Sequence, residues 1–249
     1  MLHLIADPSD AEGDLLRIRG AEVNHIRNVL RLKQGEEISV SIGADGKEYR
    51  YGIEAMGETE VICRLRFVKE ADVELPVKVW LFQGLPKSDK MDFIVQKAVE
   101  LGASVIVPVA MERCVVKLDA ARAVKKTERW QKIAASAASQ SRRAVIPEVR
   151  QPLSMKEAVA LAKRETDCRL IPYERQEDDG SQRQMLESVR NAVQAVSIFI
   201  GPEGGFAPEE IAMAQEADIH PISLGRRILR TETAGLTVLS WLIYILEIE

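Results

Sequence analysis

The segment FIGPEGGF, residues 199–206, places one carboxylate among three glycines and a proline, directly after an apolar run. The run at 196–200 predicts a buried strand, and Pro208, Glu209 and Glu210 predict the first turn of a helix. In an open α/β sheet, ligands bind beyond the carboxyl ends of strands, where glycines let backbone groups contact them. The segment therefore predicts a binding loop lined by backbone, although a plain strand-to-helix turn would use the same glycines. A phosphate loop is excluded, because the Lys-Ser/Thr pair is missing and the carboxylate would repel phosphate.

A second loop of the same kind follows in PISLGRRILRTETAG, residues 221–235. A predicted strand at 221–224 ends at Gly225, and a basic, apolar segment then leads into the last helix, for which Thr231 is a natural N-cap. If the two strands are neighbours, the two loops form one composite pocket. The alternative is a capped helix start with solvated arginines.

The residue types of both loops suit a nucleoside that carries a positive charge. Aliphatic side chains would hold an adenine ring while backbone groups bind its edge, and the free N–H groups that start the last helix would receive a carboxylate. Glu203 or Glu232 would then lie near a cation. S-adenosylmethionine combines an adenine, a carboxylate and a sulfonium cation, so this pattern is compatible with it. The aliphatic residues are Ile200, Leu224, Ile228 and Leu229.

The rest of the sequence indicates an ordinary globular protein. Its 249 residues are 46% hydrophobic and 29% charged, which predicts one or two domains. Cys63, Cys114 and Cys168 lie far apart, without a CxxC pair or a nearby histidine cluster, and predict buried thiols in a reducing compartment with no metal site. The N-terminus lacks a signal-peptide pattern, and the apolar stretch 236–246 is about half a bilayer span. We therefore expect a cytoplasmic protein with a buried C-terminal helix.

The net charge of −4 argues weakly against nucleic acid, because phosphate binding depends on Lys and Arg. Basic residues nevertheless cluster in segments 25–33, 86–90 and 139–143. These clusters indicate either local basic faces or solvated helix surface.

The hydrophobic pattern changes along the chain. Residues 1 to about 70 alternate apolar and polar types, carry the Asp-Gly turn signal GADGK at 43–47 and predict a small antiparallel barrel or sheet, interrupted by one helix at 22–32. A linker closes at Pro76. From residue 77, continuous apolar runs alternate with helical patterns, which predicts an α/β domain with a mainly parallel sheet covered on both faces.

The two loops resemble those of the RsmE family, the 16S ribosomal RNA uridine N3-methyltransferases of the SPOUT superfamily. The resemblance extends through segments 25–36, 87–104, 113–117 and 129–143, and so covers nearly the whole chain. It implies a PUA-like RNA-binding β-barrel at 1–72 and a SPOUT methyltransferase domain with a trefoil knot at 73–249. It also implies a homodimer, a substrate in 16S ribosomal RNA or the small ribosomal subunit, and methylation of uridine 1498 at N3.

The resemblance carries the S-adenosylmethionine site onto residues of both loops. The first loop contributes Ile200, Gly201, Pro202, Glu203, Gly204 and Gly205, and the second contributes Leu224, Gly225, Ile228, Leu229, Arg230, Thr231 and Ala234. The chain departs from the family pattern at Ala207, often Ser, at Val99, often Thr, and in KSDK at 87–90, which usually contains glycine. These departures concern local stability and RNA contacts.

Methylation at N3 requires an unpaired or flipped base, loss of the N3 proton and alignment with the sulfonium methyl. We assign Arg230 to stabilising the imide anion and Glu232 to accepting the proton; the alternatives are a phosphate contact and a helix-dipole interaction. Two other functions stay open: a SPOUT enzyme of different specificity, such as ribose 2′-O-methylation, and a non-catalytic ribosome-assembly factor that binds RNA. Candidate phosphate contacts are Arg27, Arg31, Lys87, Lys90, Arg142 and Arg143.

Overall fold

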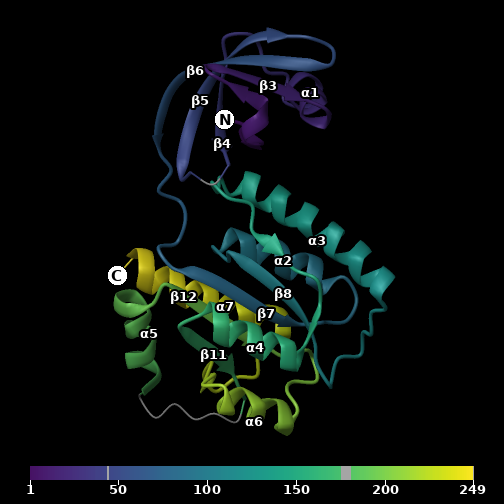
Figure 1. Ribbon diagram of the computed structural model, residues 1–249, viewed down its shortest axis with the longest axis vertical. Coiled ribbons are helices and arrows are strands. Elements are labelled where there is room, and N and C mark those ends of the chain that lie inside the picture. The colour runs from purple at the N-terminus through teal and green to yellow at the C-terminus, as the bar shows by residue number, and fades with distance from the viewer. Residues whose placement is uncertain (44, 175–180, 249) are drawn as a thin grey trace. The chain divides into compact units, whose positions relative to one another are not determined.

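The computed structural model describes residues 1–43, 45–174 and 181–248. The chain divides into two compact units, which are coloured by position in Figure 1. Unit 1 contains Met1–Glu74 and Ala138–Ile146, and unit 2 contains Leu75–Ala137 and Pro147–Glu249. The sequence predicted a single division between residues 72 and 73, so the return of segment 138–146 to unit 1 was not anticipated.

Unit 1 is built on a six-stranded sheet with strand order β1-β4-β5-β6-β3-β2. Strand β1 is parallel to β4, whereas the other described pairs are antiparallel. The predicted hairpin is confirmed by the β4–β5 pair, although Ala44 of its turn lies outside the described residues. Closure of this sheet into a barrel stays a prediction. The strands are β1 (His3–Ala6), β2 (Ala11–Glu12), β3 (Leu15–Arg19), β4 (Glu37–Ile42), β5 (Lys47–Met56) and β6 (Glu60–Glu70).

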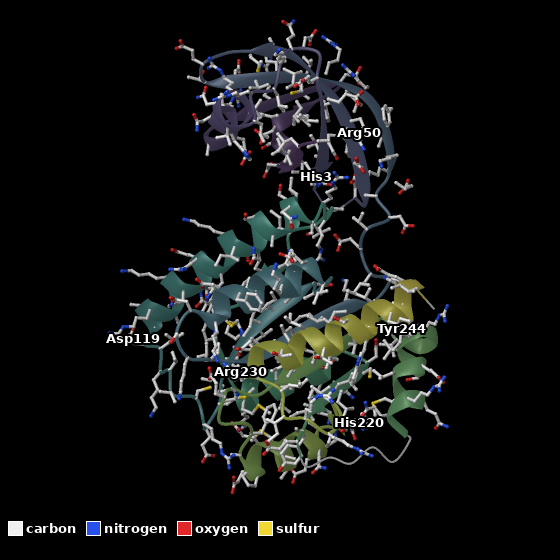
Figure 2. All side chains as sticks on the ribbon, turned by 180° about the vertical axis from the view of Figure 1, so that it is seen from behind. His3, Arg50, Asp119, His220, Arg230 and Tyr244 are labelled. Carbon is white, nitrogen blue, oxygen red and sulfur yellow. The ribbon has the colours of Figure 1, made fainter. Side chains whose placement is uncertain are left out.

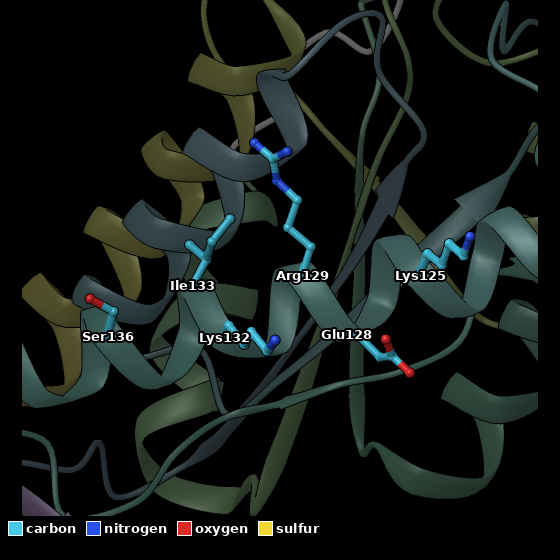
Figure 3. Close-up of a pocket in the computed structure, with 6 residues that line it drawn as sticks. All are labelled: Lys125, Glu128, Arg129, Lys132, Ile133 and Ser136. Atoms are coloured by element: carbon cyan, nitrogen blue, oxygen red, sulfur yellow. The ribbon is translucent and has the colours of Figure 1, made fainter. Parts of the chain in front are cut away.

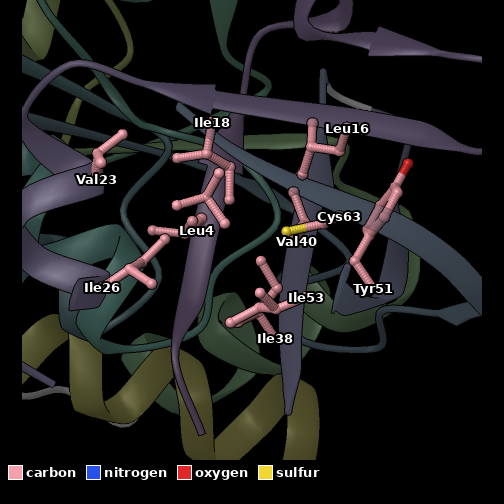
Figure 4. Close-up of a cluster of buried hydrophobic side chains, with 11 residues drawn as sticks. Leu4, Leu16, Ile18, Val23, Ile26, Ile38, Val40, Tyr51, Ile53 and Cys63 are labelled. Carbon is pink, nitrogen blue, oxygen red and sulfur yellow. The ribbon is translucent and has the colours of Figure 1, made fainter. Parts of the chain in front are cut away.

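Alternate residues of these strands form the core of unit 1 (Figure 4). Leu16 and Ile38 are fully buried, as the period-two pattern predicts. The helix predicted at 22–32 is shorter and consists of two pieces, α1 (Ala21–Asn24) and a π-helical turn, η2 (His25–Val29). A short 3₁₀ turn, η1 (Pro8–Asp10), follows β1.

Segment 138–146 belongs to unit 1 because its polar groups are satisfied there. The Nε2 of His3 donates to the carbonyl oxygen of Arg143 (3.1 Å), and the Arg143 guanidinium pairs with Glu74. Burial lowers the pKa of His3. Arg143 is only 4% exposed, so the prediction that it binds RNA phosphate is corrected. Its guanidinium is buried in unit 1 and forms an ion pair with Glu74.

Unit 2 contains an all-parallel sheet in the order β10-β8-β7-β12-β11-β13, with β9 paired to β8. All six residues of β12 are buried, which requires cover on both faces. The parallel, doubly covered α/β sheet predicted from the apolar runs is therefore confirmed. The strands are β7 (Lys78–Gly84), β8 (Val105–Ala110), β9 (Glu148–Val149), β10 (Leu153–Ser154), β11 (Cys168–Pro172), β12 (Ala195–Ile200) and β13 (His220–Ile222).

The helices of unit 2 pack in two groups: α2 contacts α7, and α4 contacts α6. Helix α2 ends before Gly102, whose φ of 87° matches its predicted role beyond a helix C-terminus. The three cysteines are buried and unbridged, as predicted, and burial raises the pKa of Cys63 to about 12. The helices are α2 (Lys90–Glu100), α3 (Ala120–Gln140), α4 (Met155–Glu165), α5 (Ser181–Ala192), α6 (Pro208–Glu216) and α7 (Thr231–Ile243), followed by a π-helical segment, η3 (Tyr244–Ile248).

Helix α4 begins with the capping box that the sequence predicted. The backbone N–H of Glu157 donates to Ser154 Oγ, and the Ser154 N–H donates to the Glu157 carboxylate (2.9 Å). We expect Ser154→Ala to lower the free energy of unfolding by about 1 kcal/mol, measured by urea denaturation. Ser154→Thr, which keeps the acceptor, is the control, and equal stability of the alanine variant would contradict the role of the cap.

The C-terminal helical stretch is longer than predicted, because only the apolar run 236–246 was counted. Thr231–Ile248 is long and apolar enough to cross a membrane by length and composition alone, a test that core helices also pass, and 33% of it is buried. Its inner face, including Val238 and Leu242, is buried, and α7 contacts α2 and β12. The outer side leaves Tyr244 54% exposed, so burial is confirmed for one face only.

Candidate cofactor site

A cavity of about 390 Å³, hereafter the cofactor cavity, lies at the carboxyl ends of β11, β12 and β13 in unit 2. It is bounded by the start of α7, where Figure 2 labels Arg230. The sequence predicted a shared pocket on the condition that β12 and β13 are neighbours, and this condition is not met: β11 lies between them and pairs with both. The two loops still meet because Pro172 and Tyr173, at the end of β11, complete the wall between them.

The cofactor cavity brings together nearly all the residues assigned to cofactor binding. Gly204 is the exception: its carbonyl oxygen accepts a hydrogen bond from Arg113 (3.1 Å), outside the lining. The lining residues that were predicted are Ile200, Gly201, Pro202, Glu203, Gly205, Leu224, Gly225, Ile228, Leu229, Arg230, Thr231 and Ala234.

A buried chain of hydrogen bonds joins the two loops. Gln83 Nε2, at the end of β7, donates to Thr231 Oγ1 (2.9 Å), and that hydroxyl donates to the carbonyl oxygen of Gly201 (2.6 Å). Thr231 is therefore the first residue of α7 rather than its N-cap; Arg230 occupies the cap without a side-chain hydrogen bond. The hydroxyl that the sequence assigned to the helix instead holds the glycine loop.

Sequence reasoning missed Gln83. This side chain is fully buried, and its Oε1 has no hydrogen-bond partner among the described residues. A signal was present, since a glutamine in the run VKVWLFQG places an amide at the end of a strand that otherwise reads as apolar core. Phe206 and Tyr173, which also line the cofactor cavity, were missed because the loops were read only for backbone and aliphatic contacts.

We expect Thr231→Val to weaken S-adenosylmethionine binding by up to about 30-fold. The isosteric change leaves the Gly201 carbonyl and a Gln83 N–H without their partner, at about 1 kcal/mol each. Isothermal titration calorimetry measures the loss, and Thr231→Ser, which keeps the hydroxyl, should bind as the unchanged protein does. Equal affinity for the valine variant would show that the loops hold their places without this chain.

One ammonium and two carboxylates cluster at the cofactor cavity. Lys90 Nζ, at the start of α2, lies 2.9 Å from Glu203 and 3.2 Å from Glu232. The backbone N–H of Lys87 donates to both Glu203 oxygens (3.2 Å). Partial burial opposes ionisation of Glu203, but the hydrogen bonds from Lys90 and the backbone outweigh it and lower the pKa of this carboxyl. Hydrogen bonding to Glu203 raises the pKa of Lys90.

We expect Lys90→Met to raise the pKa of Glu203, because burial then acts with less opposition. The acid limb of the pH profile of kcat/KM should move to higher pH. The free energy of unfolding should fall in the variant at neutral pH. In the unchanged protein, the ionised Glu203 stabilises the fold above its unfolded pKa of about 4.3, and this contribution is lost as pH falls through the lower folded pKa. The variant no longer has the lowered folded pKa and therefore lacks this contribution. Lys97→Met, which removes a lysine paired with Glu100 on the same helix, is the control, and an unmoved acid limb would contradict the assignment.

The two candidate catalytic residues differ in their placement. Arg230 is exposed and lines the cofactor cavity. Glu232 is not part of that lining, and its carboxylate contacts Lys90 in the first turn of α7. The geometry therefore gives Glu232 a direct role in holding Lys90, alongside the helix-dipole interaction that the sequence left open.

The candidate phosphate contacts fall in both units. In unit 1, Arg27 donates to the Gly57 carbonyl oxygen (2.8 Å), while Arg31 and Arg142 are exposed, with φ of 54° and 59°. In unit 2, Lys87 is exposed, whereas Lys90 is engaged by the two carboxylates. Lys90 thus lines the cofactor cavity, and its charge is compensated there by two carboxylates, which leaves it less suited to bind an RNA phosphate.

The two walls of the cofactor cavity are held unequally. The first is anchored at the start of α6, where buried Glu210 accepts from the N–H groups of Ala207 and Glu112 (2.9 Å each). Glu210 thus makes one half of a capping box, the hydrogen bond from the Ala207 N–H, while the hydroxyl acceptor that a serine at 207 would add is absent. The described hydrogen bonds of segment 223–230 lie toward its two ends: Gln182 exchanges two with Ser223, and the Arg230 carbonyl oxygen accepts from the N–H groups of Thr233 and Ala234. Between these ends, Ile228 is 86% exposed.

The described residues contain no group of three or more His, Cys, Asp or Glu side chains that could hold a metal ion. Backbone groups of the two loops, Arg230 and the Lys90 ion pairs lie at the cofactor cavity.

Comparison with known proteins bears on this site. Residues 73–243 match the RNA methyltransferase domain family, and residues 18–66 match the RNA methyltransferase PUA domain family. The chain is 37% identical to ribosomal RNA small subunit methyltransferase E of Bacillus subtilis, over 95% of this chain and 93% of that protein.

Two solved structures are similar to this chain over nearly its full length. A putative methyltransferase from Legionella pneumophila, solved with bound S-adenosylmethionine, superposes with a TM-score of 0.84 at 34% identity, covering 97% of this chain and 96% of that one. A ribosomal RNA small subunit methyltransferase E from Neisseria gonorrhoeae, also bound to S-adenosylmethionine, gives 0.83 at 30% identity, covering 98% of each chain.

Proposed function

This chain belongs to the ribosomal RNA small subunit methyltransferase E family, and we propose that it methylates N3 of one uridine in small-subunit ribosomal RNA. S-adenosylmethionine is its methyl donor, since relatives with 30–34% identity over the whole chain are solved with that molecule bound. The observation that carries the proposal is the cofactor cavity, in which two glycine loops, an arginine and a carboxylate-bound lysine meet.

The lining of the cofactor cavity fits the methyl donor chemically. The partly buried backbone at Gly201 and Gly205, which lines the cavity, suits the polar edge of adenine, and the aliphatic Ile200 and Leu229 suit its faces. Glu203 supplies a carboxylate for the sulfonium charge, and the uncapped N–H groups at the start of α7 suit the methionine carboxylate. When bound, S-adenosylmethionine supplies an electrophilic methyl group.

We assign the remaining chemistry to side chains of the chain. Loss of the N3 proton leaves negative charge on the uracil oxygens, and Arg230 stabilises it from the rim of the cofactor cavity. Lys90, held by Glu203 and Glu232, provides a second cation. Glu232 remains our candidate proton acceptor, provided that its carboxylate turns from Lys90 toward the base. Alignment of base and methyl group contributes roughly 7–11 kcal/mol.

We further propose that residues 1–72 form a PUA-like barrel that binds RNA, and that residues 73–249 carry the trefoil knot. The half-exposed apolar face of α7 and η3 supports a homodimer, because a second copy would cover Tyr244 and its neighbours. We place the protein in the cytoplasm with its ribosomal substrate, and uridine 1498 of 16S ribosomal RNA is the expected target.

The experiment is methyl transfer from labelled S-adenosylmethionine to small ribosomal subunits that lack the modification, followed by primer extension. An N3-methyl group blocks base pairing and stops reverse transcriptase at one uridine, whereas a ribose 2′-O-methyl group mostly does not. Label in the RNA without a stop would support ribose methylation instead. Absence of labelled RNA and of cofactor binding would support a non-catalytic assembly factor.

A further inference from the structure

One face of α3 carries concentrated positive charge that the cofactor cavity does not use. Between residues 122 and 132 the helix has five cations and one carboxylate, on a chain whose net charge is −4. An open groove of about 400 Å³ runs along this face (Figure 3). We call this the α3 face; it consists of Lys125, Glu128, Arg129, Lys132, Ile133 and Ser136.

Two lysines of the α3 face lack a compensating charge. Arg129 pairs with Asp92, but Lys125 and Lys132 are exposed, and neither forms an ion pair with any described carboxylate. They lie seven residues apart, two turns along one side of the helix, which spaces them by about 10 Å. In Figure 3 both extend from the same stretch of α3, with Arg129 between them in sequence. Two lysines without an ion pair, spaced along one side of a helix, are suited to successive anionic groups.

The α3 face is hydrogen-bonded to α2, the helix whose first residue lines the cofactor cavity. Buried Trp130 donates from Nε1 to Asp92 on α2 (3.1 Å), and the neighbouring Arg129 binds the same carboxylate. Helix α2 begins two residues earlier at Lys90, which lines the cofactor cavity. The α3 face and the methyl-transfer centre are therefore parts of one packed assembly within unit 2.

We propose that the α3 face binds the phosphate backbone of the substrate RNA beside the flipped-out nucleotide. This inference rests on the proposed function, which requires an RNA with an unpaired base at the cofactor cavity. A protein partner fits the face less well, because it offers one aliphatic side chain, Ile133, and exposed lysines, which are depleted from protein interfaces. Lysines of this kind are the usual partners of phosphate.

The test is RNA binding by the full chain carrying Lys125→Gln and Lys132→Gln together. The probe is the unmodified small-subunit ribosomal RNA transcript, with small ribosomal subunits in a parallel series. Loss of two single-strand phosphate contacts should lower the salt slope of log Kobs by about 1.4 and weaken binding about tenfold at low salt. Affinity for S-adenosylmethionine should be unchanged.

The control removes the same charge elsewhere. Lys156 and Lys163 are exposed on α4, also seven residues apart, and their double glutamine variant should keep the full salt slope. An α3 variant that binds and methylates like this control overturns the inference while leaving the proposed function intact. An α3 variant with altered sedimentation and an unchanged salt slope also overturns it, by assigning the face to protein. Failure of the unsubstituted protein to methylate RNA would refute the proposed function itself.

Discussion

Replacement of Arg230 by alanine will lower kcat for methyl transfer by about 100- to 1000-fold. Arg230 lines the cofactor cavity at the N-cap of α7, and in the proposed mechanism it stabilises the charge that develops on uracil as the N3 proton leaves. Removal of one donor from such a site typically costs about 2.7–4 kcal/mol of transition-state stabilisation. Single-turnover methylation of small ribosomal subunits measures this step apart from product release.

Binding and chemistry must be separated for this variant, because Arg230 also borders the methyl donor. We expect its dissociation constant for S-adenosylmethionine, measured by calorimetry, to change less than tenfold, and Arg230→Lys to recover part of the rate. Arg190→Ala, an exposed arginine on α5, is the control and should react normally. A kcat within threefold of the unchanged protein would remove Arg230 from the mechanism.

A single methyl group added at Gly84 will damage both the fold and the cofactor cavity. An alanine Cβ there would lie 2.7 Å from Pro202 N, 2.8 Å from Pro202 Cδ and 3.0 Å from Ile200 O. These atoms belong largely to the backbone of the first loop and cannot rotate away. We expect Gly84→Ala to lower the free energy of unfolding by about 1–3 kcal/mol. Displacement of the first loop should also reduce S-adenosylmethionine affinity more than tenfold.

Gly235→Ala is the matched control, since it adds the same methyl group against the same loop. Its Cβ would lie 3.5 Å from Ile200 Cγ1, an ordinary contact, and alanine favours the helix by up to about 1 kcal/mol. Thermal and urea unfolding should show this variant to be equal or more stable. If Gly84→Ala matched it in stability and cofactor affinity, the close approach of β7 to the first loop would have no energetic weight.

Local patterns of the sequence were enough to predict local structure. The period-two alternation around Leu16, the Ser154 capping box and the strand before Gly201 depend on neighbouring residues, and each was found where expected. Around Ile38 the alternation was not found, because Ser39 and Ser41 are buried as well. The residues assigned to cofactor binding line one cavity, with Gly204 excepted, and their contacts with the cofactor stay a prediction. Both loops lie at strand ends of one parallel sheet, and this alone brings them to the same edge.

Features that depend on long-range packing could not be predicted. The position of β11 between β12 and β13 is a property of strand order, and hydrophobic runs in the sequence do not indicate strand order. Arg143 appeared to be a surface cation because its partner, Glu74, is remote in sequence. Thr231 looked like a helix cap because its true partners, Gln83 and Gly201, lie far away along the chain.

We expect the two walls of the cofactor cavity to have different roles, one in binding the cofactor and the other in releasing the product. The wall tied by Glu210 and Thr231 is ready-made, so its contacts with the nucleoside cost little ordering entropy. The segment around Ile228 is exposed and has few described hydrogen bonds between its ends, so we expect it to become ordered when S-adenosylmethionine binds. This ordering would lower the affinity and leave a route by which the product of the cofactor departs. Substitutions in residues 226–229 can therefore change product inhibition with little effect on the rest of the enzyme.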